Sequence, residues 1–311
     1  MSITEYGRVG AFYDGSMLLA WRLGCKAHSW GIATEYRGKT LNRGLIGSKE
    51  VDGSKKNRFR TFDREYREGC RGKEYGGDVP LELPRKEEYF SGCEEKELLR
   101  LNCGRSTFFC AAKAAKARKI FVPYLNCANS TDPFDAAGIP YEFYRLDEDL
   151  TPRDIAPGEE DAVLWINYYG NAGEKQKQKV FETYKTVIVD NCHAFFSKPV
   201  MRDGVYNCYS TRKFFGVADG AYLIGKNLPS FSLEESFSAE DTLFILKTIE
   251  LGTNALYAEN LKNEQRVAQT VAKMSKLTRR ILSSVDYSEI QKIRFQNFCR
   301  LHRQLESLNE F

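Results

Sequence analysis

Short apolar runs alternate with helical or turn segments between Gly76 and Gly225, and this rhythm constrains the fold more than any other feature. The clearest apolar runs are Ile120–Val122, Tyr141–Tyr144, Ala162–Ile166 and Val187–Val189. Such runs are typical of strands buried on both faces, and intervening helices are typical of a parallel sheet. The sequence therefore predicts an α/β fold.

Two intervening segments have the composition of helices. Residues 105–117 contain five alanines, and Phe108, Phe109 and Ala112 are spaced to face a core. Residues 175–184 would form a crossover helix between two strands. We expect a three-layer α/β/α domain with a mostly parallel sheet over residues 67–230.

The ends of the chain differ from this central part. Residues 1–66 are basic and rich in Gly, and we expect an extension of unknown role that is separate or poorly ordered. Within it, residues 33–46 are faintly similar to the acetyl-CoA turn of GNAT acetyltransferases, but Thr40 and Asn42 stand where that family has small residues. Residues 231–311 read as a helical segment, with N-cap patterns at Ser238 and Asp286.

Composition excludes several classes of protein. A net charge of +4, from 46 basic and 42 acidic residues, is too balanced to indicate nucleic-acid binding. Nine cysteines without a Cys-x-x-Cys pair argue against a disulfide framework or a metal site. We find no signal peptide and no apolar stretch long enough to span a bilayer, so we expect a cytoplasmic protein without membrane or nucleic-acid partners.

The candidate catalytic residue is Lys213, in the run Tyr209–Gly220. An amine in an apolar, aromatic setting is expected to have a lowered pKa, as attachment to an aldehyde cofactor requires. Asp190 ends an apolar run 23 positions earlier and could pair with the ring nitrogen of pyridoxal phosphate (PLP). A surface lysine after a turn is the alternative interpretation of Lys213 taken alone.

Four blocks of sequence support the catalytic interpretation. They are Leu101–Ser106, residues 120–147, Asn167–Gly170 and the stretch from Val189 through Phe195 to Lys213. In this order and spacing they resemble the DegT/DnrJ/StrS-type PLP-dependent sugar aminotransferases, which have fold type I. The resemblance covers about three quarters of the chain, from residue 75 onward.

The resemblance implies roles for individual residues. Lys213 would hold PLP covalently and then act as the general base, and Asp190 would keep the pyridine nitrogen protonated. Gly104, Arg105 and Ser106 would bind the 5′-phosphate at a helix start, assisted by the hydroxyl of Ser210. His193 would lie near the phenolic oxygen of the cofactor; a structural role is the alternative for this residue. For Arg212 two roles remain open: raising the fraction of neutral lysine, or binding a phosphate or carboxylate.

By resemblance, the protein transfers an amino group from a glutamate-like donor to a keto-sugar nucleotide, in polysaccharide or amino-sugar synthesis, as a homodimer. Two features depart from the family. Cys127 stands where an aromatic ring would stack on the cofactor, leaving Tyr124, Tyr168 or Tyr169 as substitutes, and the chain ends before the family's small C-terminal domain. The alternative is a truncated, inactive family remnant with a binding or assembly role.

Overall fold

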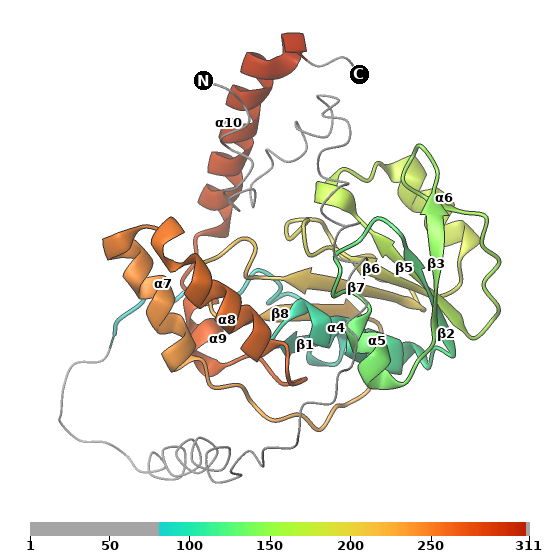
Figure 1. Cartoon of the computed structure of the whole chain (residues 1–311), viewed down its shortest axis with the longest axis horizontal. Helices are drawn as coiled ribbons and strands as arrows, with labels where there is room; N and C mark the ends of the chain where they lie inside the picture. The colour runs from blue at the N-terminus through green and yellow to red at the C-terminus, as the bar shows by residue number, and fades with distance from the viewer. Residues whose placement is uncertain (1–80, 309–311) are drawn as a thin grey trace, which may run out of the picture. The chain divides into compact units, whose positions relative to one another are not determined.

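The computed structural model describes residues 81–308, and Figure 1 shows their arrangement. The extension predicted over residues 1–66 lies outside this range. Residues 83–304 belong to a single folded unit built around one sheet. No helix within the described range is long and apolar enough to cross a membrane.

Eight strands form the sheet, in the order β1-β8-β7-β6-β5-β2-β3-β4. Their bounds are β1 (Leu98–Leu101), β2 (Lys119–Pro123), β3 (Tyr141–Leu146), β4 (Pro152–Arg153), β5 (Asp161–Ile166), β6 (Val187–Asp190), β7 (Val205–Ser210) and β8 (Ala221–Gly225). The central strands β7, β6, β5, β2 and β3 are mutually parallel. β8 runs antiparallel to both β7 and β1, and β4 runs antiparallel to β3. The mostly parallel sheet confirms the predicted fold class.

The helices occupy the segments between and after the strands. Their bounds are α4 (Gly104–Ala115), α5 (Asp132–Ala137), α6 (Glu174–Thr183), α7 (Ala239–Leu251), α8 (Tyr257–Val267), α9 (Lys276–Leu282) and α10 (Tyr287–Leu305). Short 3-10 turns lie at η2 (Glu95–Glu97), η3 (Tyr168–Gly170), η4 (Asn254–Leu256) and η5 (Glu306–Leu308). The helical segment predicted after residue 231 is therefore present.

The core lies on both faces of the sheet, which makes three layers. Phe108 of α4 and Phe134 of α5 pack with Ile120, Val122 and other residues on one face. On the opposite face, α6 packs with a set that includes Phe121, Val163, Trp165, Val187 and Val189. Successive residues of a strand point to opposite faces, so a strand buried on both sides is apolar at every position. This explains the continuous apolar runs of the sequence.

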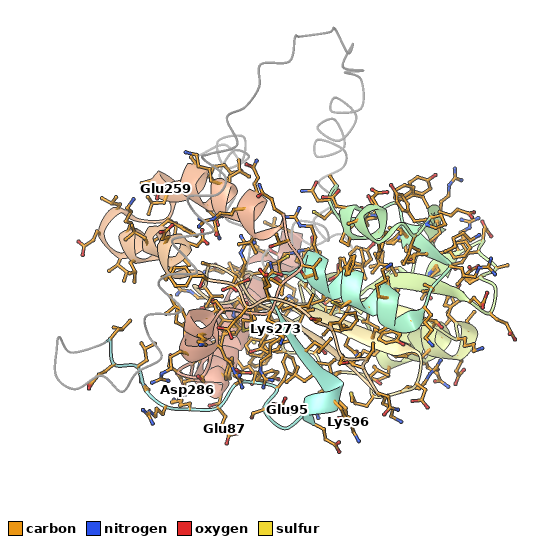
Figure 2. The ribbon with its side chains drawn as sticks, turned by 90° about the horizontal axis from the view of Figure 1, so that it is seen from below. Glu87, Glu95, Lys96, Glu259, Lys273 and Asp286 are labelled. Atoms are coloured by element: carbon orange, nitrogen blue, oxygen red, sulfur yellow. The ribbon has the colours of Figure 1, made fainter. Side chains whose placement is uncertain are left out.

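A second cluster on the α6 face involves the C-terminal part of the chain. Leu282 of α9 packs with Phe90, Tyr209, Tyr222 and Ile224. A short extended segment beside β1 leads into α9. Its residue Lys273 (labelled in Figure 2) forms isolated backbone β-bridges with Leu101 of β1 and with Glu235. The segment after α8 thereby continues the sheet beyond β1 and attaches α9 to it.

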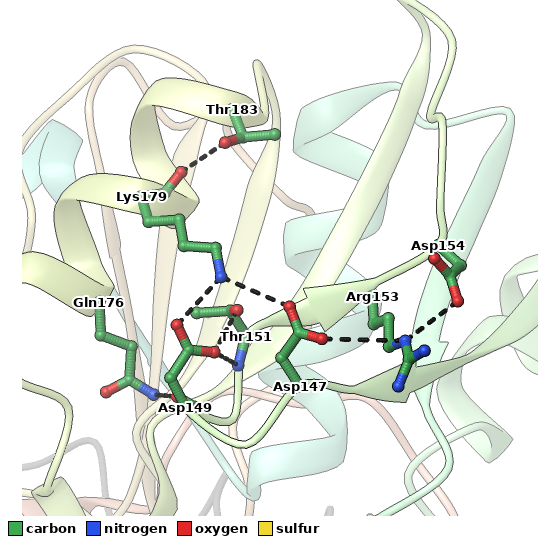
Figure 3. Close-up of polar contacts among 8 residues, drawn as sticks. All are labelled: Asp147, Asp149, Thr151, Arg153, Asp154, Gln176, Lys179 and Thr183. Carbon is green, nitrogen blue, oxygen red and sulfur yellow. Dashed lines mark hydrogen bonds and ion pairs between the residues drawn. The ribbon is translucent and has the colours of Figure 1, made fainter.

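The turn between β3 and β4 is tied to α6 by an exposed ion network, shown in Figure 3. Lys179 Nζ lies 3.0 Å from Asp149 Oδ2 and 3.5 Å from Asp147 Oδ2, and Arg153 pairs with Asp147 and Asp154. Surface ion pairs of this kind contribute about 0–1 kcal/mol each. The network orients the turn and contributes little to the stability of the fold.

A buried carboxylate joins three parts of the unit. Glu88 is 7% exposed, and its two oxygens lie 2.6 Å from Nε of Arg100 in β1 and 2.9 Å from Nε of Arg279 in α9. A buried charge requires such partners, because desolvation would otherwise expel it. Glu88 therefore holds the segment before β1 and the start of α9 to the sheet edge.

We predict that Glu88→Ala lowers the free energy of unfolding by about 3 kcal/mol, because it leaves the half-buried Arg100 guanidinium without its counter-ion. Urea denaturation followed by circular dichroism measures the change. Glu87→Ala is the matched control, since Glu87 is exposed and its substitution should change stability by less than about 0.5 kcal/mol. Equal small effects of the two variants would contradict the account.

Candidate active site

Three neighbouring parallel strands end at the same edge of the sheet and bring the candidate residues together. Ile166 of β5 pairs with Asp190 of β6, and Asp190 pairs with Cys208 of β7. Ser210 ends β7 two residues later, and Lys213 follows in the next loop. In parallel α/β sheets ligands bind at the carboxyl ends of the strands, which is where these residues lie.

Two buried amides fasten the ends of β5 and β6. Asn167 and Asn191 are each 2% exposed, and Asn167 Nδ2 donates to Asn191 Oδ1 at 2.9 Å. Asn167 Nδ2 also contacts the hydroxyl oxygen of Ser197 at 3.2 Å, and Asn167 Oδ1 accepts from the backbone of Ala172. These bonds satisfy the amide groups and fix the loops that carry the candidate residues.

Asp190 is held by the loop that follows it. Its Oδ1 accepts a hydrogen bond of 2.8 Å from the backbone N–H of Cys192. The neighbouring thiol of Cys192 is fully enclosed, and burial together with the Asp190 carboxylate raises its pKa well above the ordinary value. Cys192 is therefore a neutral packing residue beneath the carboxylate and does not act as a nucleophile.

Lys213 lies against His193. Lys213 Nζ is 2.7 Å from Nε2 of the imidazole, and Lys213 itself is half-buried. Desolvation and the nearby Lys213 ammonium lower the pKa of His193 to about 4, with the Asp190 carboxylate opposing them. A neutral imidazole that accepts from Lys213 through Nε2 carries its own proton on Nδ1. At neutral pH His193 is therefore a hydrogen-bond acceptor that orients the Lys213 amine.

An aromatic ring covers the imidazole. Tyr169 stacks on His193 with ring centroids 5.3 Å apart and planes 7° from parallel. Tyr169 has φ of 56°, a left-handed conformation that costs a non-glycine residue about 1–3 kcal/mol. Tyr124 and Tyr168 were the other two candidates for the stacking ring that Cys127 does not supply. Tyr124 stacks on Phe143, and the Tyr168 hydroxyl donates to the carbonyl of Leu125. Cys127 itself is exposed.

The start of α4 lies beside this group. Its N-cap residue, Cys103, makes no side-chain capping bond, so first-turn N–H groups of the twelve-residue helix remain available to an anion. A Cβ on Gly104 would lie 3.1 Å from Cys192 Sγ and 3.9 Å from Ser210 Cβ. A side chain at position 104 would crowd Cys192, so a glycine at this position lets α4 approach the loops after β6 and β7 closely.

The remaining residues predicted at the phosphate make internal contacts. Ser106 is buried and its hydroxyl donates to Asn102 Oδ1 at 2.6 Å, so its contribution to an anion would come from its backbone N–H. Arg105 pairs with Asp132 at 3.4 Å and donates to the Glu264 carbonyl at 3.2 Å. Arg212 pairs with the Glu264 carboxylate at 3.2 Å. Both arginines therefore contact α8 through Glu264.

Asp219, the other carboxylate near Lys213 in sequence, has a structural role. It is 1% exposed and accepts from the backbone N–H and the hydroxyl of Ser275 at 2.9 and 2.8 Å, and from the hydroxyl of Thr278. These bonds fix the start of α9. Asp190, whose carboxylate is bonded only within its own loop to Cys192 among the contacts described above, remains the candidate partner for a ring nitrogen.

The residues present fit PLP. An uncapped helix start, next to a glycine that leaves room, suits the phosphate; a carboxylate at the end of a strand suits the ring nitrogen; and Lys213 suits the aldehyde. Nothing in the sequence spacing indicated Glu264 or the Tyr169 stack on His193. Between residues 81 and 308 no group of three or more His, Cys, Asp or Glu side chains could hold a metal ion.

Comparisons with known proteins add only remote structural similarity. No protein-family model matches the chain, and no curated protein matches it in sequence. Bna3p from Saccharomyces cerevisiae is 10% identical over 71% of this chain and 57% of its own, with a TM-score of 0.44. L-threonine-O-3-phosphate decarboxylase from Porphyromonas gingivalis is 13% identical over 69% of this chain and 63% of its own, with a TM-score of 0.38.

The sugar aminotransferase CalS13 from Micromonospora echinospora is 15% identical, covering 55% of this chain and 56% of its own, with a TM-score of 0.33. Each match spans less than two thirds of the other protein's length. At this distance the activity and substrate of the chain have to be inferred from its own residues.

The lowered pKa of His193 predicts a pH dependence of stability. Between pH 6.5 and about 4 the unfolded chain binds a proton at this histidine and the folded chain does not, so the stability contributed by neutral His193 falls as the pH falls through that window. Above pH 7 the contribution of His193 to the stability is constant. Urea denaturation of wild type and His193→Asn across pH 4–8 should show a steeper loss in the wild type; identical slopes would contradict the prediction.

Proposed function

We propose that this protein is a PLP-dependent aminotransferase. The observation that carries the proposal is the placement of Lys213 Nζ 2.7 Å from neutral His193, at the sheet edge where Asp190 ends β6 and the uncapped start of α4 approaches. A lysine for the aldehyde, a carboxylate for the ring nitrogen and an anion site for the phosphate are the groups by which a protein would hold PLP, and His193 adds a hydrogen-bond acceptor beside the lysine.

PLP, when bound, supplies an aldehyde that forms a covalent link to an amine and a ring that withdraws electrons from that amine's α-carbon. Lys213 Nζ would hold the cofactor and, when it is not attached to the cofactor, would take the proton from the α-carbon of the amino donor. His193 Nε2 accepts a hydrogen bond from Lys213 Nζ and would orient the amine towards the cofactor. Asp190 provides the negative charge that keeps a ring nitrogen protonated.

We assign the substrate class from the sequence motifs. The four blocks similar to sugar aminotransferases favour a glutamate-like amino donor and a keto-sugar nucleotide acceptor, in polysaccharide or amino-sugar synthesis. An inactive remnant with a binding role is the competing proposal. It would keep the fold but take up no cofactor, so cofactor binding distinguishes the two.

Wild-type protein mixed with PLP should acquire the visible absorbance of the covalently attached cofactor, and Lys213→Ala should abolish it, because the substitution removes the amine that lies beside His193. Lys226→Ala is the control: Lys226 is exposed in the turn after β8, and its loss should leave the spectrum unchanged. The absence of absorbance in the wild type, or equal absorbance in Lys213→Ala, would exclude the enzyme proposal.

Asp190→Asn should keep the fold and PLP attachment but slow the half-reaction with glutamate by about 10- to 100-fold, because asparagine cannot stabilise a protonated ring nitrogen. The estimate corresponds to a charged hydrogen bond of roughly 1.5–3 kcal/mol. Stopped-flow absorbance measures it, with exposed Asp203→Asn as the control. A slowing of less than about threefold would mean that Asp190 does not have this role.

We further propose that the protein is a homodimer in which α7 contributes to the interface. Leu243, Leu246 and Ile249 lie along one side of α7 and are 54%, 51% and 80% exposed. Contiguous exposed apolar side chains are typical of interaction surfaces.

If this surface forms the dimer, Ile249→Glu should shift sedimentation from dimer to monomer at micromolar concentration. Lys175→Glu, which changes charge on an exposed position of α6, should leave the assembly unchanged. A monomeric wild type would contradict the proposed assembly.

A further inference from the structure

The turn Asn167–Gly170 holds a large aromatic residue in an unfavourable conformation. Tyr169 has φ 56° and ψ 16°, and it is followed by Gly170 at φ 77°. A bulky side chain in the left-handed region persists only where its surroundings determine it, and such residues concentrate at functional sites. The surroundings here are specific: Asn167 anchors the turn to Asn191, and a Cβ on Gly170 would lie 3.5 Å from Ala194 Cβ.

The conformation directs the Tyr169 ring onto His193. The two rings are parallel within 7°, with centroids 5.3 Å apart. His193 lies on the loop after β6 between the buried residues Cys192 and Ala194, so its backbone is fixed and its imidazole has only side-chain rotation left. Stacking restricts that rotation, and in the restricted orientation Nε2 lies 2.7 Å from Lys213 Nζ.

We propose that Tyr169 is a positioning residue that holds the His193 imidazole against Lys213 and excludes water from one face of it. The inference rests on the proposed role of Lys213, because a histidine held in this way matters for function only if the lysine is the reacting amine. It adds a defined role to a residue that sequence alone offered only as a possible stacking ring for a cofactor.

The titratable groups around His193 come from the loops that follow β5, β6 and β7. Lys213, after β7, disfavours the imidazolium, and Asp190, at the end of β6, favours it. Cys192 beside Asp190 is neutral because its thiol pKa is raised, and burial also raises the pKa of the Tyr169 phenol, so neither adds a charge at neutral pH. Desolvation is the largest cause of the lowered His193 pKa, and the Tyr169 ring lies over one face of an imidazole whose residue is otherwise exposed.

Two variants separate the ring from the backbone conformation. Tyr169→Gly removes the ring while tolerating the left-handed backbone, and Tyr169→Phe keeps the ring and removes the hydroxyl. Tyr169→Asn, which also tolerates this backbone region, replaces the glycine variant if that protein does not fold. Tyr141→Leu is the matched control, a half-buried tyrosine packed edge-on against Phe143 at the start of β3.

The readout is the NMR titration of the histidine rings in protein without cofactor. The chain has three histidines, so His193→Asn assigns the signal. We expect Tyr169→Gly to raise the His193 pKa by about one unit towards its ordinary value, because water then also reaches the face of the imidazole that the ring covers. Tyr169→Phe and Tyr141→Leu should titrate as the wild type does.

A folded Tyr169→Gly or Tyr169→Asn protein with an unchanged His193 pKa would overturn the inference. A shift in Tyr169→Phe equal to that in Tyr169→Gly would also overturn it, since the hydroxyl and not the stacked ring would then be responsible. As a second readout, Tyr169→Gly should slow attachment of PLP to Lys213 at least threefold while Tyr169→Phe does not. If the wild type takes up no PLP, the proposed function fails, but the titration still decides whether Tyr169 positions His193.

Discussion

The parallel pairing of β5, β6 and β7 is the constraint on which the site depends. Because these strands run in the same direction and in a fixed register, Asn167, Asp190 and Ser210 come to one edge although more than 40 residues separate the first from the last. A one-residue slip of β6 would turn Ile188 from one face of the sheet to the other and displace Asp190 with it. The apolar residues buried on both faces oppose such a slip, so the core determines where the carboxylate lies.

Close packing of α4 against the sheet positions the start of this helix, which is the candidate anion site. Cys110, Ala111 and Ala112 have no solvent exposure, and their small side chains let the helix lie near the sheet. Gly104 then brings the first turn against Cys192 and Ser210. The position of α9 is fixed by hydrogen bonds: the buried carboxylate of Asp219 accepts from Ser275 and Thr278.

The apolar runs of the sequence predicted β2, β3, β5 and β6, and the sequence was less informative for the other strands. β7 contains Asn207, which is fully buried and bonds to the backbone of Val200 and Ile224, so its polar residue interrupts the apolar pattern. β1 contains Arg100, whose partner Glu88 lies outside the strand. These strands depend on contacts between distant residues, which a local pattern cannot reveal.

In the candidate site, too, some features follow from local sequence and others depend on contacts between distant residues. Local chemistry and the family resemblance gave Lys213 and Asp190 as candidates, and the predicted N-cap at Asp286 is confirmed by its hydrogen bond with the Glu289 amide. At Ser238 the hydroxyl instead bonds to Ser275, because a buried partner from another segment replaces the local cap. The pairing of Glu264 with Arg212 and the stacking of Tyr169 on His193 depend on the register of loops in space.

The central claim is that Lys213 is the amine that holds PLP, with His193 and Asp190 arranged around it. The most direct test is to incubate the full chain with PLP, reduce the carbon–nitrogen linkage with borohydride and locate the modified peptide by mass spectrometry. The account predicts a single modified lysine, Lys213, and no such modification in Lys213→Ala. Modification at another lysine, scattered modification over exposed lysines, or none at all would contradict it.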